Sequence, residues 1–330
     1  MNVGYRIQGA RFRIQDVGFW IGKNAVFTSG EAESTQRGWR PHMKEEGIHI
    51  ETLPELQKPI LIVGFGGWGN ALNVATETVA YLIRKFKAGS FAKLNPDLFY
   101  RYDQARPIVN IEKGALKDLS IPGGFFYAAK PGSEGRDLLI LKAEEPNLRW
   151  QYFAEEVFSL CERLGVEYVI TLGSMIDNVL HSDRIVSGFG SSEALLEKLR
   201  QKNVSPISYH GPSAIHSTLH SEGKKRGFPC ISLWCHCPYY LQGATHFGMM
   251  SHLGSLLSHF GEFELETDEL EEKWKELEEE IQKVIETNPQ AQALVKELRK
   301  AKVRGSWERM KDSAKQDGKV INLQDFLDPK

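Results

Sequence analysis

The sequence predicts an α/β protein: a three-layer α/β/α sandwich with a mixed sheet, followed by a C-terminal helical hairpin. Two patterns predict this fold. Short apolar runs bounded by turn residues alternate with amphipathic stretches at helical spacing, which is typical of strands covered by helices on both faces. After residue 262 the chain becomes rich in Glu and keeps its apolar residues on one helical stripe. A chain of 330 residues is long enough to bury such a core without disulfides.

The core is expected over residues 54–262. It begins with the apolar run 60–63, which predicts a strand, and a helix is expected over 71–86. Further strands are expected at 108–111, 125–129, 138–141, 168–172, 184–188 and 230–234. Further helices are expected at 150–164, 191–201, 212–226 and 245–259. Because short strands between residues 106 and 141 interrupt the alternation of strand and helix, a mixed sheet is favoured over a purely parallel one.

An acidic helical hairpin is expected over residues 263–302. Its first helix carries an apolar stripe at alternating spacings of four and three: Leu270, Trp274, Leu277, Ile281 and Val284. The pair Asn288-Pro289 then ends this helix and starts the second one. Two interpretations stay open for the stripe. It is either a helical cap over the α/β core or a surface for a partner or a second copy of the chain.

Both ends of the chain differ from the core. Residues 1–53 hold many Arg and Lys and keep no sustained apolar period, so a poorly structured N-terminal extension is expected. Residues 303–330 are polar and contain Gly305 and Gly318, which predicts a flexible tail. We therefore expect both segments to be dispensable for the folding of the core.

Composition excludes several classes of protein. The chain has 41 Lys and Arg against 43 Asp and Glu, so it lacks the basic excess of a nucleic-acid binder. No apolar stretch approaches the length of a membrane span, and the first residues lack the apolar segment of a secretory signal. Four Cys in this length do not form an extracellular disulfide framework. A soluble, cytoplasmic protein that binds neither nucleic acid nor membrane is expected.

The turn from Gly64 to Gly69 follows a strand, begins a helix and matches G-x-G-x-x-G, a pattern found where backbone amides contact a pyrophosphate. A dinucleotide site also needs an acidic residue about 20 residues further on, and residues 83–92 offer none. Trp68 inside the loop would also crowd a pyrophosphate. A tight structural turn is favoured, and contact with another anion or a partner stays open.

Cysteine and histidine residues do not form a zinc motif. In a strand, Cys235 and Cys237 point to one face and His236 to the other, and a second Cys pair is missing. His216 and His220 share a helix face, but the Glu of H-E-x-x-H is absent. No metal and no cofactor are expected. The motifs of a serine nucleophile elbow and of a Walker A loop are also missing, so no sequence motif identifies a reaction.

The ordered set of short motifs resembles the proteasome assembly chaperone two family, in its bacterial and archaeal branch. The matching segments are Gly66-Gly67-Trp68-Gly69-Asn70-Ala71, Tyr102 to Pro107, Glu145 to Trp150, Leu172-Gly173-Ser174 with His181 and Arg184, Gly211-Pro212, Ser232-Leu233-Trp234 with Pro238-Tyr239-Tyr240, and Asn288-Pro289. The resemblance covers about residues 59–300. It implies a sandwich similar to nucleoside phosphorylases and peptidyl-hydrolase-like proteins.

The resemblance also implies a function: a non-catalytic, assembly-chaperone-like interaction protein, forming a homo-oligomer of three or four chains and binding another protein. The alternative is a hydrolase, phosphorylase or ATP-dependent ligase that acts on a small anionic or nucleoside-like ligand. Its pocket would be formed by polar and loop residues at the predicted strand ends, namely Gly66, Trp68, Asn70, Asp103, Arg106, Glu145, Arg149, His181 and Arg184. In a purely structural interpretation, Arg106 and Arg149 pair with Asp103 and Glu145. If these candidate residues line one cavity, the enzyme interpretation is favoured.

Overall fold

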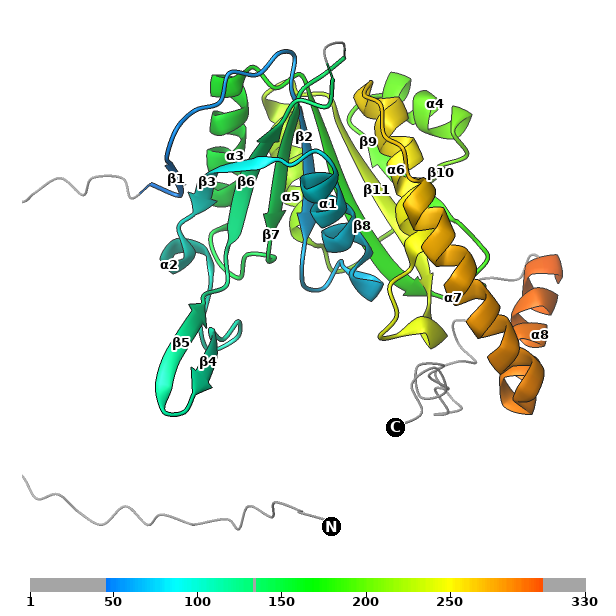
Figure 1. The fold of residues 1–330 in the computed structure, drawn as a ribbon. Helices are drawn as coiled ribbons and strands as arrows, with labels where there is room; N and C mark the ends of the chain where they lie inside the picture. Colours follow the sequence, from blue (N-terminus) through cyan, green and yellow to red (C-terminus); the bar gives the residue numbers. More distant parts are fainter. Residues whose placement is uncertain (1–45, 133–134, 305–330) are drawn as a thin grey trace, which may run out of the picture. The chain divides into compact units, whose positions relative to one another are not determined.

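The computed structural model describes residues 46–132 and 135–304. Within them, one mixed sheet of nine strands has the order β1-β3-β6-β7-β2-β8-β11-β9-β10 (Figure 1). Its strands are β1 (Ile48–Ile50), β2 (Ile60–Phe65), β3 (Gly89–Leu94), β6 (Gly124–Ala129), β7 (Leu138–Ala143), β8 (Tyr168–Asp177), β9 (Val186–Gly190), β10 (Ser205–Pro206) and β11 (Cys230–Pro238). The expected mixed sheet is therefore present, and helices flank it as predicted.

The centre of the sheet is parallel, the strands on either side join it in antiparallel orientation, and the edge strand β10 pairs in parallel with β9. Strand β2 pairs in parallel with β7 and β8, and β8 pairs in parallel with β11. All six residues of β2, Ile-Leu-Ile-Val-Gly-Phe, are buried, as expected for a parallel strand covered on both faces. Strands β6 and β9 join the parallel centre in antiparallel orientation. The carboxyl ends of β8 and β11 consequently meet at one edge of the sheet.

Helices cover both faces of the sheet. They are α1 (Val74–Lys85), α2 (Pro96–Phe99), α3 (Trp150–Leu164), α4 (Glu193–Gln201), α5 (Ile215–Lys225) and α6 (Phe247–Gly261), with single turns at Ala71–Asn73 and Tyr239–Leu241. Because side chains alternate along a strand, β2 serves two cores. Ile60 and Ile62 pack under α1, α4 and α6, whereas Leu61 and Val63 pack under α3 and α5.

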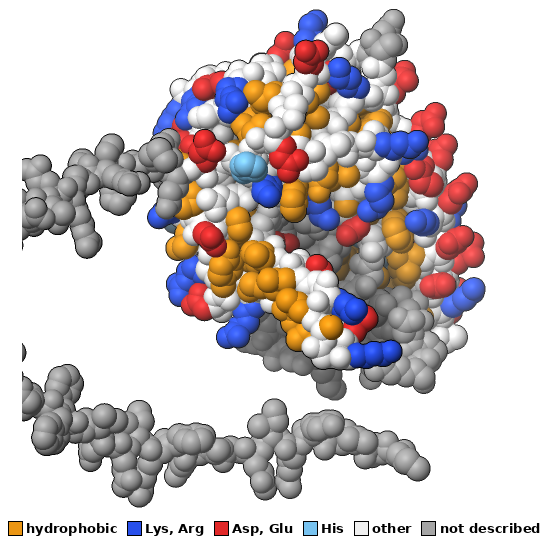
Figure 2. Space-filling view, turned by 60° about the vertical axis from the view of Figure 1, so that its left-hand side comes forward, with side chains coloured by type: hydrophobic (Ala, Val, Ile, Leu, Met, Phe, Trp, Pro, Cys, Tyr) orange, Lys and Arg blue, Asp and Glu red, His pale blue; other side chains and the backbone are white. Residues whose placement is uncertain are grey.

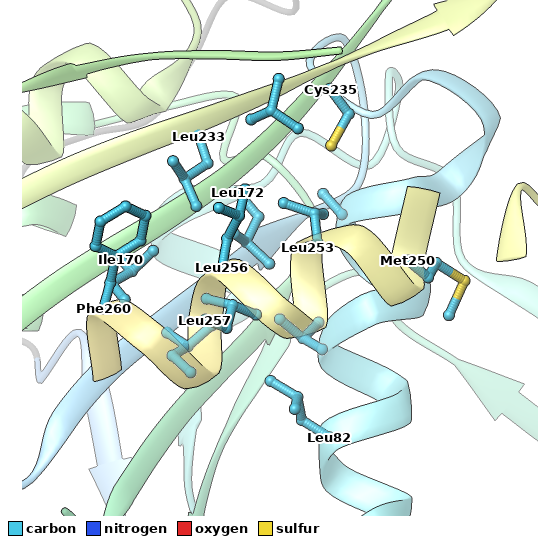
Figure 3. Packing of buried hydrophobic residues seen from close by; sticks show 14 of the residues in the cluster. Leu82, Ile170, Leu172, Leu233, Cys235, Met250, Leu253, Leu256, Leu257 and Phe260 are labelled. Carbon is cyan, nitrogen blue, oxygen red and sulfur yellow. The ribbon is translucent and has the colours of Figure 1, made fainter. Parts of the chain in front are cut away.

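Helix α6 fits the first of these cores because its apolar residues recur at helical spacing. Figure 3 shows Leu253, Leu256, Leu257 and Phe260 on this helix facing the sheet, with Leu172 of β8 and Leu233 of β11 opposite them. These side chains are buried. A buried leucine or phenylalanine contributes roughly 2–3 kcal/mol through removal from water, so this layer is a main source of stability.

The acidic hairpin forms as predicted, with α7 (Asp268–Thr287) and α8 (Pro289–Arg304). Asn288 starts α8, because its Oδ1 accepts hydrogen bonds from the amides of Gln290 and Ala291. Of the stripe on α7, Leu270 lies in the core under α1 and α6, Trp274 and Ile281 lie in a third core, and Leu277 and Val284 pack against that third core half-buried. The third core joins α7 to the Tyr239–Leu241 turn and to α8, and its buried members are Leu180, Tyr240, Leu241, Trp274, Ile281, Ile285, Ala291, Val295 and Leu298. The stripe is thus covered within the chain, and the cap interpretation holds.

Strands β4 (Ile108–Glu112) and β5 (Ala115–Ser120) form a hairpin outside the main sheet. The sequence predicts a strand here but not this separation. Lys113 and Gly114 join the two strands with φ of 49° and 78°, as a two-residue hairpin turn requires. In Figure 1 this hairpin projects below the sheet, away from the flanking helices. We call residues 108–120 the arm.

Some boundaries differ from the expectation. Strand β1 lies within the segment assigned to the N-terminal extension, where it pairs antiparallel with β3 and extends the sheet. The strand expected at 184–188 begins at Val186 instead. Residues 1–45 of the expected extension and residues 305–330 of the expected tail lie outside the described residues. No helix in the described part of the chain is long and apolar enough to span a bilayer.

Candidate functional site

A cavity of about 750 Å³ lies at the carboxyl ends of β8 and β11, on the face of the sheet that carries α5. Its walls come from the ends of these strands, from β9, and from the loop between β10 and α5. Aromatic and aliphatic side chains dominate the lining: Trp68, Ile176, Phe189, Tyr209 and Trp234. The position agrees with the general rule that α/β sheets bind ligands beyond the carboxyl ends of their strands.

Three polar side chains in the cavity wall form one hydrogen-bonded chain. His236 Nδ1 lies 2.7 Å from Asp177 Oδ2, and His236 Nε2 lies 2.8 Å from Ser187 Oγ. Asp177 ends β8, His236 is near the end of β11, and Ser187 is near the start of β9. Trp234 pairs with Ser187 and Pro238 with Asp177, so the register of the sheet brings the three groups together.

The hydrogen bonds of Asp177 fix the tautomer of His236. Its Oδ1 accepts from the backbone amide of Asn178 at 2.8 Å, and its Oδ2 faces His236. A carboxylate oxygen can only accept, so Nδ1 of the imidazole must carry the proton. In the neutral ring Nε2 is then an acceptor, and the hydroxyl of Ser187 donates to it.

Beneath the cavity, His216 of α5 supports Trp234. Its ring lies 4.9 Å from the indole, and Nε2 donates to the carbonyl of Leu172 at 2.8 Å. Burial lowers the pKa of His216 to about 4, because the charged form loses its hydration. Its Nδ1 is buried and has no partner within the described residues. His216 is therefore neutral at pH 7 and acts as packing for the cavity floor.

The glycine turn at residues 64–69 is a structural turn. A Cβ at Gly64 would lie 2.7 Å from the carbonyl oxygen of Ala75, so only glycine lets β2 approach α1 this closely. The side chain of Asn70 accepts from the amides of Ala75 and Thr76 at 3.1 and 3.3 Å. These are the amides that a pyrophosphate would need. The structural interpretation of the turn is supported.

The candidate residues from the sequence do not converge on one site. Of the nine, all within the described residues, Trp68 alone lines the cavity. Asn70 caps α1, and Gly66 packs so tightly on Glu144 that a Cβ would lie 2.2 Å from its carboxylate. Asp103 pairs with Arg101 at 2.6 Å, not with Arg106 as the structural interpretation expected, and Arg106 is exposed.

The remaining candidates hold elements in place. Glu145 accepts from the amide of Ile215 at 2.9 Å and so caps α5, and Arg149 precedes α3 in a left-handed conformation with φ of 55°. Arg184 donates two hydrogen bonds to the carboxylate of Glu271 on α7, at 2.6 and 2.7 Å. Glu145, Arg149 and Arg184 are not among the residues that line the cavity.

His181 belongs to the junction between the hairpin and the core. Its Nδ1 lies 3.0 Å from the hydroxyl of Tyr240, and its ring lies 6.4 Å from that of Trp274. Burial lowers the pKa of His181 to about 4 and that of neighbouring His246 to about 3. Both rings are therefore neutral at pH 7 and contribute packing at this junction.

The cysteines follow the predicted strand parity. Cys235 and Cys237 are buried in the core under α1 and α6, whereas His236 points to the cavity side. Burial raises the pKa of Cys237 to about 12, so its thiol stays protonated. Among the described residues no three His, Cys, Asp or Glu side chains are grouped to hold a metal ion. The absence of zinc stays a prediction.

Asp177 and Ser187 are not among the candidate residues from the sequence, and His236 is considered there only as a metal ligand. Ser187 stands in Val-Ser-Gly-Phe-Gly, which is not a nucleophile elbow, and the three residues are spread over 60 positions of the chain. The sequence gives only a weaker indication of this site than a motif would. Each residue lies in or just beyond a predicted strand, and a polar side chain at a strand end is a candidate for a site in this class of fold.

The chain is similar to known proteins in sequence and in fold. The model of the PAC2 family matches residues 61–285. A PAC2 family protein from Streptomyces avermitilis is 26% identical, with a TM-score of 0.65 over 72% of this chain and 99% of that one. A Mycobacterium tuberculosis proteasome-assembly chaperone homologue, Rv2125, is 24% identical, with a TM-score of 0.65 over 72% and 99%.

A third structure, Pyrococcus furiosus PbaB, described as an archaeal proteasome activator, is 23% identical. Its TM-score is 0.54 over 72% of this chain and 97% of that one. The second and third likenesses show the fold alone. No curated protein matches the chain.

Proposed function

The chain belongs to the PAC2 family, and from that premise we propose that it is a homo-oligomeric interaction protein of the assembly-chaperone kind. Proteins of similar fold are described as a proteasome-assembly chaperone homologue and a proteasome activator, which motivates the proposal. This role requires a surface that binds other chains, and it requires no reaction. We keep the expected cytoplasmic location and the expected assembly of three or four chains as parts of this proposal.

The observation that supports it is the apolar face of the arm. Val109 and Ile111 alternate on β4, and their partners across the hairpin are Leu119 and Leu116. Paired residues of an antiparallel hairpin share a face, so the four side chains form one apolar patch. Their exposed fractions are 50, 61, 49 and 62%. Figure 2 shows hydrophobic side chains gathered in a band over the lower part of the molecule, where the arm lies.

We do not expect an arm of this kind to persist alone in water. A two-stranded hairpin is at best marginally stable by itself, and contiguous exposed apolar patches mark interaction sites. Ile121 and Phe125, both exposed, continue the apolar surface from the arm toward the main sheet. Covering this face with another protein surface would stabilise the hairpin and remove the patch from water.

A second copy of this chain is the occupant that fits best. The charges on the arm are balanced, with Glu112 and Asp118 against Lys113 and Lys117. Arms that pack together in an assembly of three or four chains therefore carry no net charge, and net charge does not oppose their association. Closed symmetric assemblies are the usual outcome for such self-complementary surfaces. In this proposal the apolar faces of the arms pack against each other, and the remaining surface binds a protein partner.

The test is the molar mass of the full chain in solution. In size-exclusion chromatography with light scattering, the unaltered chain is expected at three or four times its mass of 37.3 kDa. The variant Val109→Asp/Ile111→Asp should elute as a monomer, because two buried carboxylates without partners oppose association. The control Gln104→Asp/Ser120→Asp adds the same charge at exposed positions outside the apolar face and should assemble normally.

Two results would contradict the proposal. One is a monomeric unaltered chain at tens of micromolar. The other is a Val109→Asp/Ile111→Asp variant that keeps the mass of the unaltered protein. Circular dichroism and the thermal midpoint of each variant show whether the core is folded, so that loss of assembly is not confused with unfolding.

A further inference from the structure

We propose that Ser187, His236 and Asp177 form a hydrolase site for neutral carboxylic esters with an apolar acyl chain. The proposal is independent of the arm, and it departs from the non-catalytic role that the sequence favoured. It rests on three features of the cavity: the hydrogen-bonded order of the three side chains, the rigid strands that hold them, and the chemistry of the walls.

The hydrogen bonds run in the order that activates a serine. The hydroxyl of Ser187 donates to His236 Nε2 at 2.8 Å, and Nδ1 donates to Asp177 at 2.7 Å. The serine, histidine and carboxylate roles recur on unrelated folds in different chain orders, so the order Asp177, Ser187, His236 is no obstacle. Strands fix all three residues, and a rigid scaffold holds such a site more exactly than a mobile loop.

The position of His236 is further restrained by its backbone. Its amide donates to the carbonyl of Ile185 at 3.0 Å, which ties β11 to the segment just before β9. The amide of Ile207 donates to the carbonyl of Gly188 at 3.0 Å, so the loop that closes the cavity is anchored next to Ser187. The nucleophile, the base and the cavity wall therefore keep their relative positions.

The walls select for a neutral, apolar substrate. No Lys or Arg is among the described residues that line the cavity. A phosphate or nucleotide would find no cation there, which disfavours the phosphorylase and ligase alternatives. Trp68, Ile176, Phe189 and Trp234 instead offer a surface for an alkyl or aryl acyl group. A volume of about 750 Å³ is in the usual range for a small-molecule site.

The reaction follows from these groups and water. Ser187 Oγ attacks the ester carbonyl carbon, a C–O bond forms to the serine, and the hydroxyl proton moves to His236 Nε2. The bond to the leaving alkoxide breaks, and that oxygen takes the proton from Nε2, which leaves an acyl-serine and an alcohol. Water then gives a proton to Nε2 and attacks the acyl carbon. The bond to Oγ breaks, the serine recovers its proton, and a carboxylic acid leaves.

In this scheme Ser187 and His236 are the catalytic residues. Asp177 is a positioning residue that holds the imidazole in the required tautomer and stabilises the imidazolium when it forms. A serine without such a base is a weak nucleophile, so reactivity at Ser187 above that of other serines is the property that distinguishes this site from a merely structural hydrogen-bond chain.

The test is covalent labelling of the full chain with an alkyl fluorophosphonate, in which a serine oxygen displaces fluoride from phosphorus. Intact-mass spectrometry is expected to show one adduct per chain, and peptide mapping should place it on Ser187. Ser187→Ala should lose the adduct. The control Ser205→Ala, which removes a serine hydroxyl from the wall of the same cavity, should keep it. Thermal midpoints establish that both variants are folded.

Turnover is measured on the same preparations with p-nitrophenyl butyrate and octanoate. The unaltered chain should release p-nitrophenol at least 100-fold faster than Ser187→Ala. Absence of an adduct at millimolar probe, or an undiminished adduct in folded Ser187→Ala, would overturn the proposal. Turnover no greater than that of Ser187→Ala would overturn it as well.

Discussion

Replacing Trp274 by alanine is expected to lower the free energy of unfolding by about 3–5 kcal/mol, the cost of removing a fully packed aromatic side chain. Trp274 lies on α7 and is only 3% exposed. Its ring stacks on His246 with centroids 4.5 Å apart and an interplanar angle of 18°. It also packs on Gly248, where a Cβ would come within 2.8 Å of the indole. The change leaves a cavity between the hairpin and α6.

Urea denaturation of the unaltered chain and of Trp274→Ala measures this loss of free energy of unfolding. Trp68→Ala is the matched control. Trp68 has the same side chain but is 64% exposed, so its removal should change stability by no more than about 0.5 kcal/mol. Light scattering should give folded Trp274→Ala the mass of the unaltered chain, because the stripe of α7 is covered within one chain. Equal losses for the two variants would contradict the account of the hairpin as a cap.

Replacing Asp177 by asparagine is expected to slow ester turnover by roughly 10³–10⁴-fold with little change in stability. The asparagine Oδ1 can still accept from the amide of Asn178, so the local backbone is retained. Its Nδ2, however, donates toward His236 Nδ1. The proton then moves to Nε2, and the imidazole can no longer accept the proton of Ser187.

This variant separates positioning from structure through a split between kcat and KM. We expect kcat to fall, KM to stay within about twofold, and fluorophosphonate labelling of Ser187 to slow in proportion to kcat. Asp103→Asn is the control, because Asp103 is exposed and pairs with Arg101 outside the cavity. Unchanged turnover in folded Asp177→Asn would show that the carboxylate has no role in the reaction.

Much of the fold could be predicted because the buried strands and helices have strong periodicity. The run Ile-Leu-Ile-Val in β2 and the helical spacing in α6 report burial directly. Strands β1, β3 and β10 were missed. They are short or lie toward the edges of the sheet, and the exposed Gly89, Ser90 and Lys93 weaken the apolar pattern of β3. Of the arm, the sequence predicts a strand at 108–111 but not β5, and the residues at 108–111 do not indicate whether that strand joins the main sheet.

The site could not be predicted in the same way, because it depends on sheet register. Asp177 and His236 come together only when β8 and β11 pair in parallel, and Ser187 joins them through the antiparallel pairing of β9. Single-sequence patterns contain neither pairing. Asn70 and Arg184 are conspicuous polar residues in the sequence, but Asn70 caps a helix and Arg184 joins the hairpin to the core. Structural roles of this kind look like functional ones until their partners are known.

The central claim, that copies of the chain meet through the arm, is tested most directly by cross-linking at the arm. The natural cysteines Cys161, Cys230, Cys235 and Cys237 are all buried, so a cysteine introduced at position 111 is the reactive one among the described residues. With a short bis-maleimide, Ile111→Cys should form covalently linked chains on a denaturing gel. Glu197→Cys, at an exposed position of α4 away from the arm, should not. An Ile111→Cys protein that light scattering shows to be assembled, yet that yields no linked chains, would contradict the claim.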